Sequence, residues 1–369
     1  MKKTTLLSML YGASIIGASA ANLSLDLSDG NSIDWHDASW LNDGNSAGWS
    51  DNSDATITNS AGATTRLSFS QDVTVNNLHF DKIGDTKQVH AFTGSNGATF
   101  TVNGELTSNL GDKIAFNGIG TQLGGSGTIS GAEVHLNNNT MLASNSNLTV
   151  AAGGILRIAQ SAKFNGAALG LNGGTLKISS TLASDSLSAL RGNGNIELDG
   201  GTGSNTVITM SLNIGANADG SGVGRMYVDN KNTGPGNAGR YTFQLAGVNE
   251  FDLTKIGDTL DSDQFIGTDD ASFTLVYGGE LLLKINEDIA GTDLELGDTF
   301  KLFDVANSSG DFDSINDGGY LASINENWGW EFDPTTGELK VIEIPEPSSA
   351  ALLGLAGVAM IMRRRNTRA

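Results

Sequence analysis

Cysteine is absent from the 369-residue chain, and proline and basic residues are scarce. Without cysteine the chain has no disulfide framework, no thiolate metal site and no cysteine nucleophile. The 21 Lys and Arg against 41 Asp and Glu give a formal net charge of −20, which argues against binding to the phosphate backbone of nucleic acid. Four prolines, and 49 glycines without a three-residue period, exclude a collagen-like chain. The 38% hydrophobic content is enough for a folded core.

Residues 1–20 have the three parts of a secretory signal peptide. Lys2 and Lys3 supply the positive charge, an apolar stretch follows, and the small residues Ala18 and Ala20 form a cleavage pattern. We therefore expect export and a mature chain that begins at residue 21. The alternative is a buried N-terminal helix.

Residues 344–369 contain a second targeting pattern. Pro345, Glu346 and Pro347 precede a mostly apolar run over 350–362, and a cluster of three arginines follows it, Arg363, Arg364 and Arg365. The run is short for the ~20 residues that span a bilayer, but the arginines indicate a cytoplasmic end by the positive-inside rule. The segment is thus expected to anchor the chain in the inner membrane with its body outside.

This arrangement resembles the PEP-CTERM sorting signal of bacterial envelope proteins. The resemblance implies that an exosortase-like membrane protease-transpeptidase recognises and processes the segment. The six named residues would then be part of a substrate of the sorting machinery and have no catalytic role. The mature protein would lie in the cell envelope, at the cell surface or outside the cell, after transient anchoring. An ordinary single-span tail anchor is the alternative.

The body between these ends is more acidic than the whole chain. Residues 21–362 hold 15 basic residues against all 41 acidic ones, a charge of about −26. Such a surface is soluble and self-repelling, and it suits neither DNA nor anionic lipid.

Short runs of Val, Ile, Leu, Phe and Thr, separated by Gly, Asn, Asp and Ser, predict an all-β body without long helices. A 20-residue period predicts a right-handed parallel β-helix, because this length is about one coil of that fold. Apolar residues repeat at this interval, and the polar residues Arg157, Lys177 and Glu197 alternate with them and are expected to point outward. The repeating apolar residues are Phe116, Leu136, Leu156, Leu176 and Ile196. A β-sandwich with evenly spaced strands is the alternative.

Three tryptophans near the N-terminus carry a second resemblance. The segments around Trp35, Trp40 and Trp49, together with residues 73–80, look like the autotransporter-associated β-strand repeats of surface-protein passenger domains. Such passengers are usually parallel β-helices. The three tryptophans are expected to close the end of the solenoid, with stacking on sugar rings as the alternative.

The strands become longer and more apolar after residue 239, following a glycine-rich break. We read this region as a β-rich cap over the end of the solenoid, which would prevent end-to-end strand pairing. The expected divisions are a signal peptide at 1–20, an N-terminal β-repeat region at 21–110, a β-solenoid at 111–238, a C-terminal β-cap domain at 239–343 and a sorting segment at 344–369.

The sequence identifies no catalytic, cofactor-binding or metal site. The four histidines have no zinc-type spacing, and the glycine-rich stretch 124–127 is not followed by a phosphate-binding Lys. Acidic stretches at 258–263, 269–270 and 311–313 are as consistent with solvated loops as with a glycosidase pair. Residues 311–318 depart from the calcium loop of an EF-hand at Ile315, which leaves weak calcium binding open.

The resulting hypothesis is an exported, non-enzymatic structural or adhesion protein of the cell envelope that contacts extracellular polysaccharide or glycans. A secreted polysaccharide lyase or glycoside hydrolase on a β-helix scaffold is the alternative. A third hypothesis is a mechanical stalk without a ligand.

Overall fold

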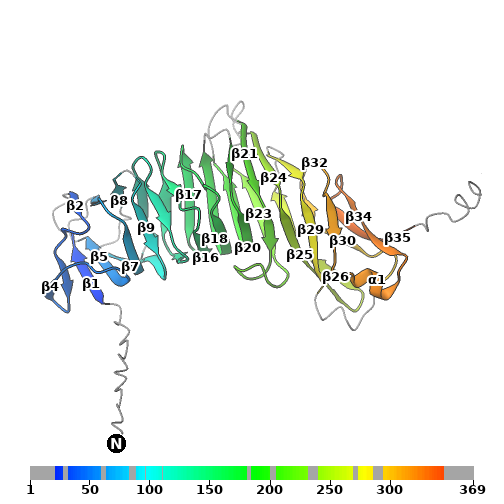
Figure 1. Ribbon diagram of the computed structural model, residues 1–369, viewed down its shortest axis with the longest axis horizontal. Helices are drawn as coiled ribbons and strands as arrows, with labels where there is room; N and C mark the ends of the chain where they lie inside the picture. Colours follow the sequence, from blue (N-terminus) through cyan, green and yellow to red (C-terminus); the bar gives the residue numbers. More distant parts are fainter. Residues whose placement is uncertain are drawn as a thin grey trace, which may run out of the picture.

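The computed structural model describes residues 21–27, 32–59, 64–82, 89–95, 97–109, 111–180, 184–199, 205–231, 240–268, 273–285 and 294–344. These residues form an elongated, mostly β body in which the strands are stacked along the long axis (Figure 1). Parallel pairing dominates, and one short helix, α1 (Tyr320–Ile324), occurs in the described part of the chain. This confirms the all-β prediction.

The parallel strands form three ladders, in each of which a strand pairs with a strand from the preceding and the following pass of the chain. The first ladder consists of β2 (Ser32–Asp34), β6 (Thr65–Phe69), β8 (Val89–Gly94), β11 (Lys113–Asn117), β14 (Glu133–Leu136), β17 (Ile155–Gln160), the second halves of β18 (Ala168–Ser180) and β20 (Ala189–Leu198), β23 (Arg225–Asn230), β27 (Gln264–Thr268) and β31 (Phe303–Asp304).

The second ladder shares β18 and β20 with the first, because both strands bend at a corner. It consists of β1 (Asn22–Asp26), β5 (Ser53–Asn59), the second half of β7 (Val73–Lys82), β10 (Glu105–Ser108), β13 (Thr128–Ser130), β16 (Asn147–Ala151), the first halves of β18 and β20, β22 (Leu212–Ile214), β25 (Val248–Ile256), β29 (Glu280–Ile285) and β33 (Ser314–Asn316).

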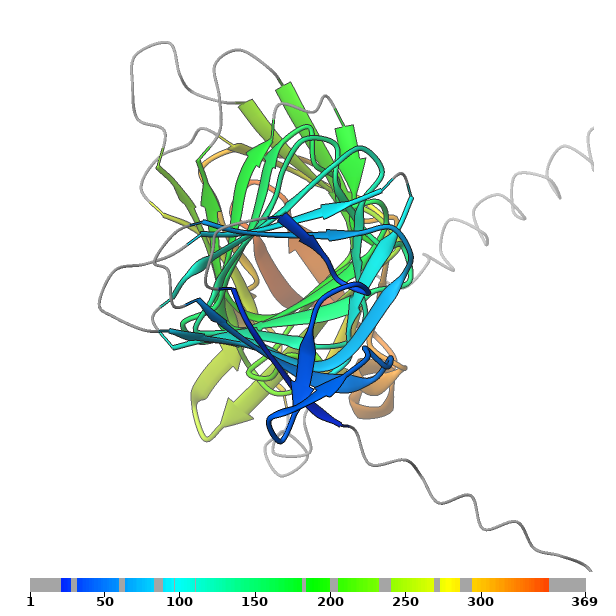
Figure 2. The same ribbon diagram turned by 90° about the vertical axis from the view of Figure 1, so that its left-hand side faces the viewer.

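The third ladder has two parts. The first half of β7, β9 (Thr99–Val102), β12 (Gln122–Gly124) and β15 (Met141–Leu142) form one part. The other part is a five-stranded sheet of β19 (Ser184–Ser186), β21 (Asn205–Met210), β24 (Arg240–Leu245), β28 (Phe273–Tyr277) and β32 (Ser308–Gly310). Seen end-on, the ladders surround a common interior (Figure 2).

Apolar side chains fill this interior in columns that run along the stack. In the first ladder, Leu156 pairs with Leu176, which pairs with Ile196, and each is at most 1% exposed. The intervening Arg157, Lys177 and Glu197 are also in register and point outward, where Lys177 Nζ lies 3.0 Å from Glu197 Oε2. The alternation predicted from the sequence is confirmed here, because successive side chains of a strand face opposite sides.

One step of the predicted register is wrong. Leu136 does not pair with Leu156 but with Ile158, while Leu156 pairs with Val134. The pass between these strands is therefore 22 residues long instead of 20. Since a shift of two residues keeps every side chain on the same face, the apolar column continues without interruption.

The ladders also extend beyond the region in which the 20-residue period is visible. Leu67 pairs with Phe92, and Phe92 with Phe116, although the connecting loops differ in length. Toward the C-terminus Ile196 pairs with Val228, and Phe265 pairs with Phe303. Strands on both sides of residue 239 are thus joined in the same ladders.

The two ends of the stack carry antiparallel elements. At one end β3 (Trp40–Asn42) pairs with both β1 and β4 (Asn45–Ala47). At the other end lie α1 and a three-stranded antiparallel sheet of β30 (Thr299–Lys301), β35 (Glu338–Glu343) and β34 (Trp328–Asp333) (Figure 1). A further antiparallel pair is formed by the end of β25 with β26 (Thr259–Ser262).

An aromatic cluster fills the interior near the first of these ends. The ring centroids of Trp35 and Trp40 are 4.7 Å apart, and those of Trp35 and Trp49 are 4.8 Å apart. Trp35 and Trp40 are fully buried, and Trp40 Nε1 donates a 2.9 Å hydrogen bond to the Trp35 carbonyl. These two rings are part of the core and are inaccessible to a sugar.

Candidate functional site

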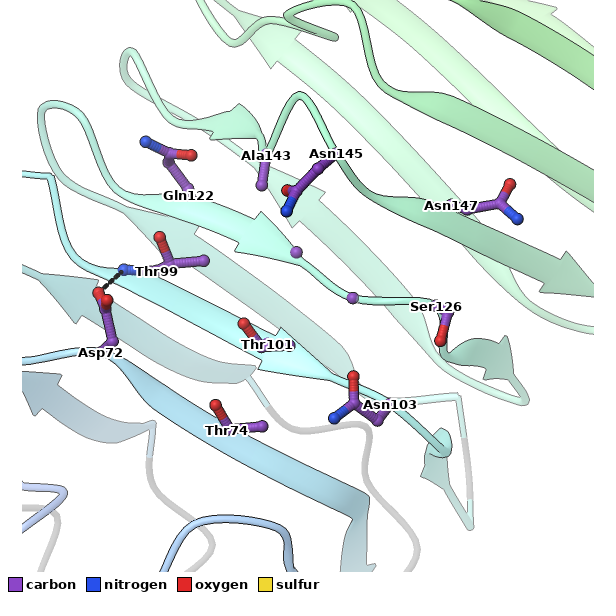
Figure 3. Close-up of a pocket in the computed structure, with 12 residues that line it drawn as sticks. Asp72, Thr74, Thr99, Thr101, Asn103, Gln122, Ser126, Ala143, Asn145 and Asn147 are labelled. Atoms are coloured by element: carbon purple, nitrogen blue, oxygen red, sulfur yellow. Dashed lines mark hydrogen bonds between the residues drawn. The ribbon is translucent and has the colours of Figure 1, made fainter.

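A polar groove lies on the outer face of the third ladder, over β7, β9 and β12 (Figure 3). Its volume is about 490 Å³. The strand register places its outward side chains in two rows, because Thr101 pairs with Thr74 on one side and Gly124 on the other, and Thr99 pairs with Gln122. The lining residues are Asp72, Thr74, Thr99, Thr101, Asn103, Gln122, Gly124, Gly125, Ser126, Ala143, Asn145 and Asn147. We call this the polar groove.

Two small residues, one in β12 and one just after β15, create the hollow. Gly124 has no side chain in the row that begins with Thr74 and Thr101, and the nearby Ala143 has only a methyl group. A Cβ at Gly124 would lie 3.2 Å from the Ala143 Cβ and 3.3 Å from Thr99 Cγ2, so these small residues pack closely and form the floor of the groove. The hollow is therefore a depression in a row of otherwise larger residues.

A tight corner forms one side of the groove. Gly125 has a φ of +104°, and a Cβ there would lie 2.1 Å from the Val102 carbonyl oxygen. The Gly127 N–H donates a 2.9 Å hydrogen bond to the same carbonyl. The glycine-rich stretch 124–127 thus turns the chain from the third ladder into the second.

The groove offers hydroxyl and amide groups and almost no charge. Asp72 is the single ionisable residue among its described lining residues, and its Oδ1 accepts a 2.8 Å hydrogen bond from the Thr99 N–H (Figure 3). Asn147 Oδ1 accepts a 3.3 Å hydrogen bond from Arg191. Such a surface can exchange hydrogen bonds with a polyhydroxylated ligand through neutral groups.

A second groove, of about 440 Å³, is acidic. Asp219, Glu250, Asp252 and Lys284 line it, together with Ile285 and the turn at 220–222. Lys284 Nζ lies 3.9 Å from Glu250 Oε2. Glu250 and Asp252 are two residues apart on β25, so both side chains lie on the same face of that strand. We call this the acidic groove.

Burial changes the acidity of two carboxyl groups near the acidic groove. It raises the pKa of Asp252, which is 7% exposed, and the neighbouring charge of Glu250 adds to this effect. It also raises the pKa of the fully buried Asp263 to about 8. Asp263 lies behind the groove, where its Oδ2 accepts a 2.5 Å hydrogen bond from the Asp252 N–H. The groove therefore combines a carboxyl group of raised pKa with a neighbouring glutamate.

The structure separates the acidic stretches noted in the sequence. Asp261 is paired with Arg225 at 2.8 Å, whereas Asp263 is buried. Residues 269–270 lie outside the described residues. In the stretch 311–318, Asp317 Oδ2 accepts hydrogen bonds from the Leu321 N–H and from Trp330 Nε1, both at 2.9 Å, and thereby holds the start of α1. Within the described ranges, no group of three or more His, Asp or Glu side chains is placed to hold a metal ion.

Two histidines take buried positions in the first ladder. His90 Nδ1 is 2.8 Å from Thr65 Oγ1, and its Nε2 is 3.3 Å from Asp112 Oδ2. His135 Nε2 lies 2.6 Å from Glu133 Oε1, while burial lowers the pKa of His135. Each of these histidines thus has a polar side chain of a nearby residue within hydrogen-bond distance.

The two targeting patterns fall outside the described residues. They comprise Ala18 and Ala20 at the signal cleavage site, and Pro345, Glu346, Pro347, Arg363, Arg364 and Arg365 in the sorting segment. No helix in the part of the chain that the structure describes is long and apolar enough to cross a bilayer. Both patterns therefore remain predictions from the sequence.

Neither groove was predicted from the sequence. The alternation at Thr99–Phe100–Thr101–Val102 signals two outward threonines, but it does not show which strands lie beside them. The chain shows no match to a family model, to a curated protein or to a solved structure.

Proposed function

We propose that this protein is an exported, non-enzymatic structural or adhesion component of a bacterial cell envelope that contacts extracellular polysaccharide. The observation that carries the proposal is the polar groove, which presents hydroxyl and amide groups on the outside of a regularly stacked body. Its lack of basic lining residues and the acidic charge of the chain are consistent with a carbohydrate partner and give no support for nucleic acid.

We infer that the three ladders form a right-handed parallel β-helix. The parallel pairing of successive passes supports this inference, and right-handed crossovers are the strong rule for parallel strands. In this interpretation β30, β34, β35 and α1 form the C-terminal cap, which would cover strand edges that can otherwise pair with another molecule. Such a body would hold a binding surface at a fixed distance from its attachment point.

The two targeting patterns support export and transient attachment to the inner membrane. The signal peptide would direct secretion, and the segment 344–369 would be processed by exosortase-like sorting machinery. Replacing Pro345, Glu346 and Pro347 with alanines in the producing cell is expected to leave unprocessed protein in the inner-membrane fraction. A processed protein at the normal location would contradict this assignment.

The proposal is tested by incubating the purified full chain with the exopolysaccharide of the producing organism. Retention by affinity electrophoresis and release of new chain ends by mass spectrometry are followed together. Retention without new chain ends is expected. If the protein shows neither retention nor cleavage, the binding function is wrong and a mechanical stalk is the better description.

The acidic groove supports a second candidate function, glycoside hydrolysis or polysaccharide cleavage. Residues two apart on a strand are about 7 Å apart along it, close to the range of carboxyl separations in inverting glycosidases. Asp252, with its raised pKa, would be the proton donor, and Glu250 the base. New chain ends that disappear in the Asp252→Asn and Glu250→Gln variants would favour this candidate over the binding protein.

A further inference from the structure

We propose that the polar groove binds an uncharged, extended polysaccharide that runs along the long axis of the body, across the strands. This inference rests on the proposed function, because it assigns a ligand class and an orientation to the same groove. Three features carry it: the spacing of the polar rows, the depression at Gly124, and the distribution of charge.

The polar rows repeat along the axis of the body. Thr74 and Thr101 occupy equivalent positions on adjacent strands, as do Thr99 and Gln122. Adjacent strands are about 4.8 Å apart. This repeat is close to the advance of one pyranose ring in an extended chain, so successive rings would meet successive hydroxyl or amide groups.

The depression gives one ring a place to sit. Gly124 and Ala143 are both buried and form the floor of the depression beside the half-buried Thr101. Exposed amides surround this space, from Asn103 on one side to Asn145 and Asn147 on the other. Ring C–H groups would lie against the small residues, while the ring hydroxyls would exchange hydrogen bonds with the amides.

The charge distribution favours a neutral ligand. The single carboxylate in the described lining, Asp72, is already engaged by the Thr99 N–H. None of these lining residues is a lysine or an arginine that could balance the carboxylates of an acidic polysaccharide, and Arg191 contacts the lining through its hydrogen bond to Asn147. The body charge of about −26 would repel such a polysaccharide further.

The test compares a soluble neutral β-glucan with polygalacturonate of matched length, using the purified full chain and affinity electrophoresis at low and physiological salt. The glucan is expected to retard the protein, whereas polygalacturonate leaves its mobility unchanged. Thr101→Trp, which fills the depression, is expected to reduce glucan affinity at least tenfold. The matched control is Thr128→Trp in β13, because Thr128 is also half-buried and outward but belongs to the second ladder. It is expected to change the affinity by less than twofold.

A second variant covers the case in which Thr101→Trp does not fold. Asn103→Ala combined with Gln122→Ala removes two amides without adding volume, and it is expected to weaken glucan binding several-fold while circular dichroism is unchanged. Retention that is equal in wild type and in this variant would overturn the groove assignment and leave the proposed function intact. Equal retention by polygalacturonate would overturn the neutral ligand class. If neither probe nor the native exopolysaccharide is retained, the proposed function itself fails.

Discussion

Asp263 Oδ1 accepts a 2.7 Å hydrogen bond from the backbone N–H of Gly224, which joins the start of β27 to the start of β23. The second carboxyl oxygen is held by the Asp252 N–H. A titratable group is thus buried at a point where two neighbouring passes of the chain meet.

We expect this group to make stability depend on pH. Its pKa is raised from 3.8 in the unfolded chain to about 8 in the folded one, so between these values the folded chain holds the additional proton. The stabilisation is fully present below about pH 3.8 and is lost as pH rises through about 8, on the order of a few kcal/mol. The free energy of unfolding measured in urea from pH 5 to 9 should therefore fall. Asp263→Asn should be less stable at pH 5 and should flatten this slope; an unchanged slope would contradict the assignment.

Leu156→Ala should destabilise the protein by about 2–5 kcal/mol, because it leaves a cavity in a column of fully buried side chains. The control is Lys177→Ala on the next strand, where loss of a partly exposed ion pair with Glu197 should cost about 1 kcal/mol or less. Urea unfolding measures both. Equal losses would mean that the inward and outward faces are assigned wrongly.

Gly125→Ala should be severely destabilising, with a loss of more than about 3 kcal/mol. Alanine is disfavoured there for two reasons: the φ of Gly125 is left-handed, and a Cβ would lie 2.1 Å from the Val102 carbonyl oxygen. Gly48→Ala is the matched change without either obstacle, since nothing lies within 4 Å of a Cβ there, and it should be nearly neutral. Thermal unfolding of the two variants distinguishes the corner from an unconstrained glycine, and a tolerated Gly125→Ala would show that the corner is not tight.

Trp40→Phe should lower stability by about 1–3 kcal/mol, because the hydrogen bond to the Trp35 carbonyl is lost and the smaller ring leaves space in the aromatic cluster. Trp328→Phe in β34 is the control, since Trp328 is only partly buried at the opposite end of the body. Denaturation followed by circular dichroism compares the two. A larger loss of stability from Trp328→Phe than from Trp40→Phe would contradict the prediction that the buried Trp40 contributes more.

The sequence was most informative where successive passes have nearly equal lengths. Between Ile114 and Ile196 the paired apolar residues recur at intervals of 20 or 22 residues, so alternation and period together predict both the parallel pairing and the inward face. The wrong pairing predicted for Leu136 left the inward and outward faces correctly assigned, because it shifted the register by two residues.

Elsewhere the pairing depended on loops whose lengths differ. The stacking of Leu67 on Phe92 is invisible to a search for a fixed interval, and so is that of Phe265 on Phe303. The polar groove depends on this pairing, since Thr74 and Gln122 become neighbours of Thr99 and Thr101 only after the strands are aligned. Asp252 and Asp263 are two acids among 41, and only burial distinguishes them.

The ladders join each strand mainly to the passes immediately before and after it, and this arrangement has a consequence for how the chain acquires its structure. After the first pass, most strands of the ladders have a partner in the pass made just before them, so loop closure is short at these steps. When the chain is exported with its N-terminus first, the strands of each pass can pair with strands that have already folded. The aromatic cluster around Trp35 would then be the folding nucleus, and the passes could fold one after another before the last strand is synthesised.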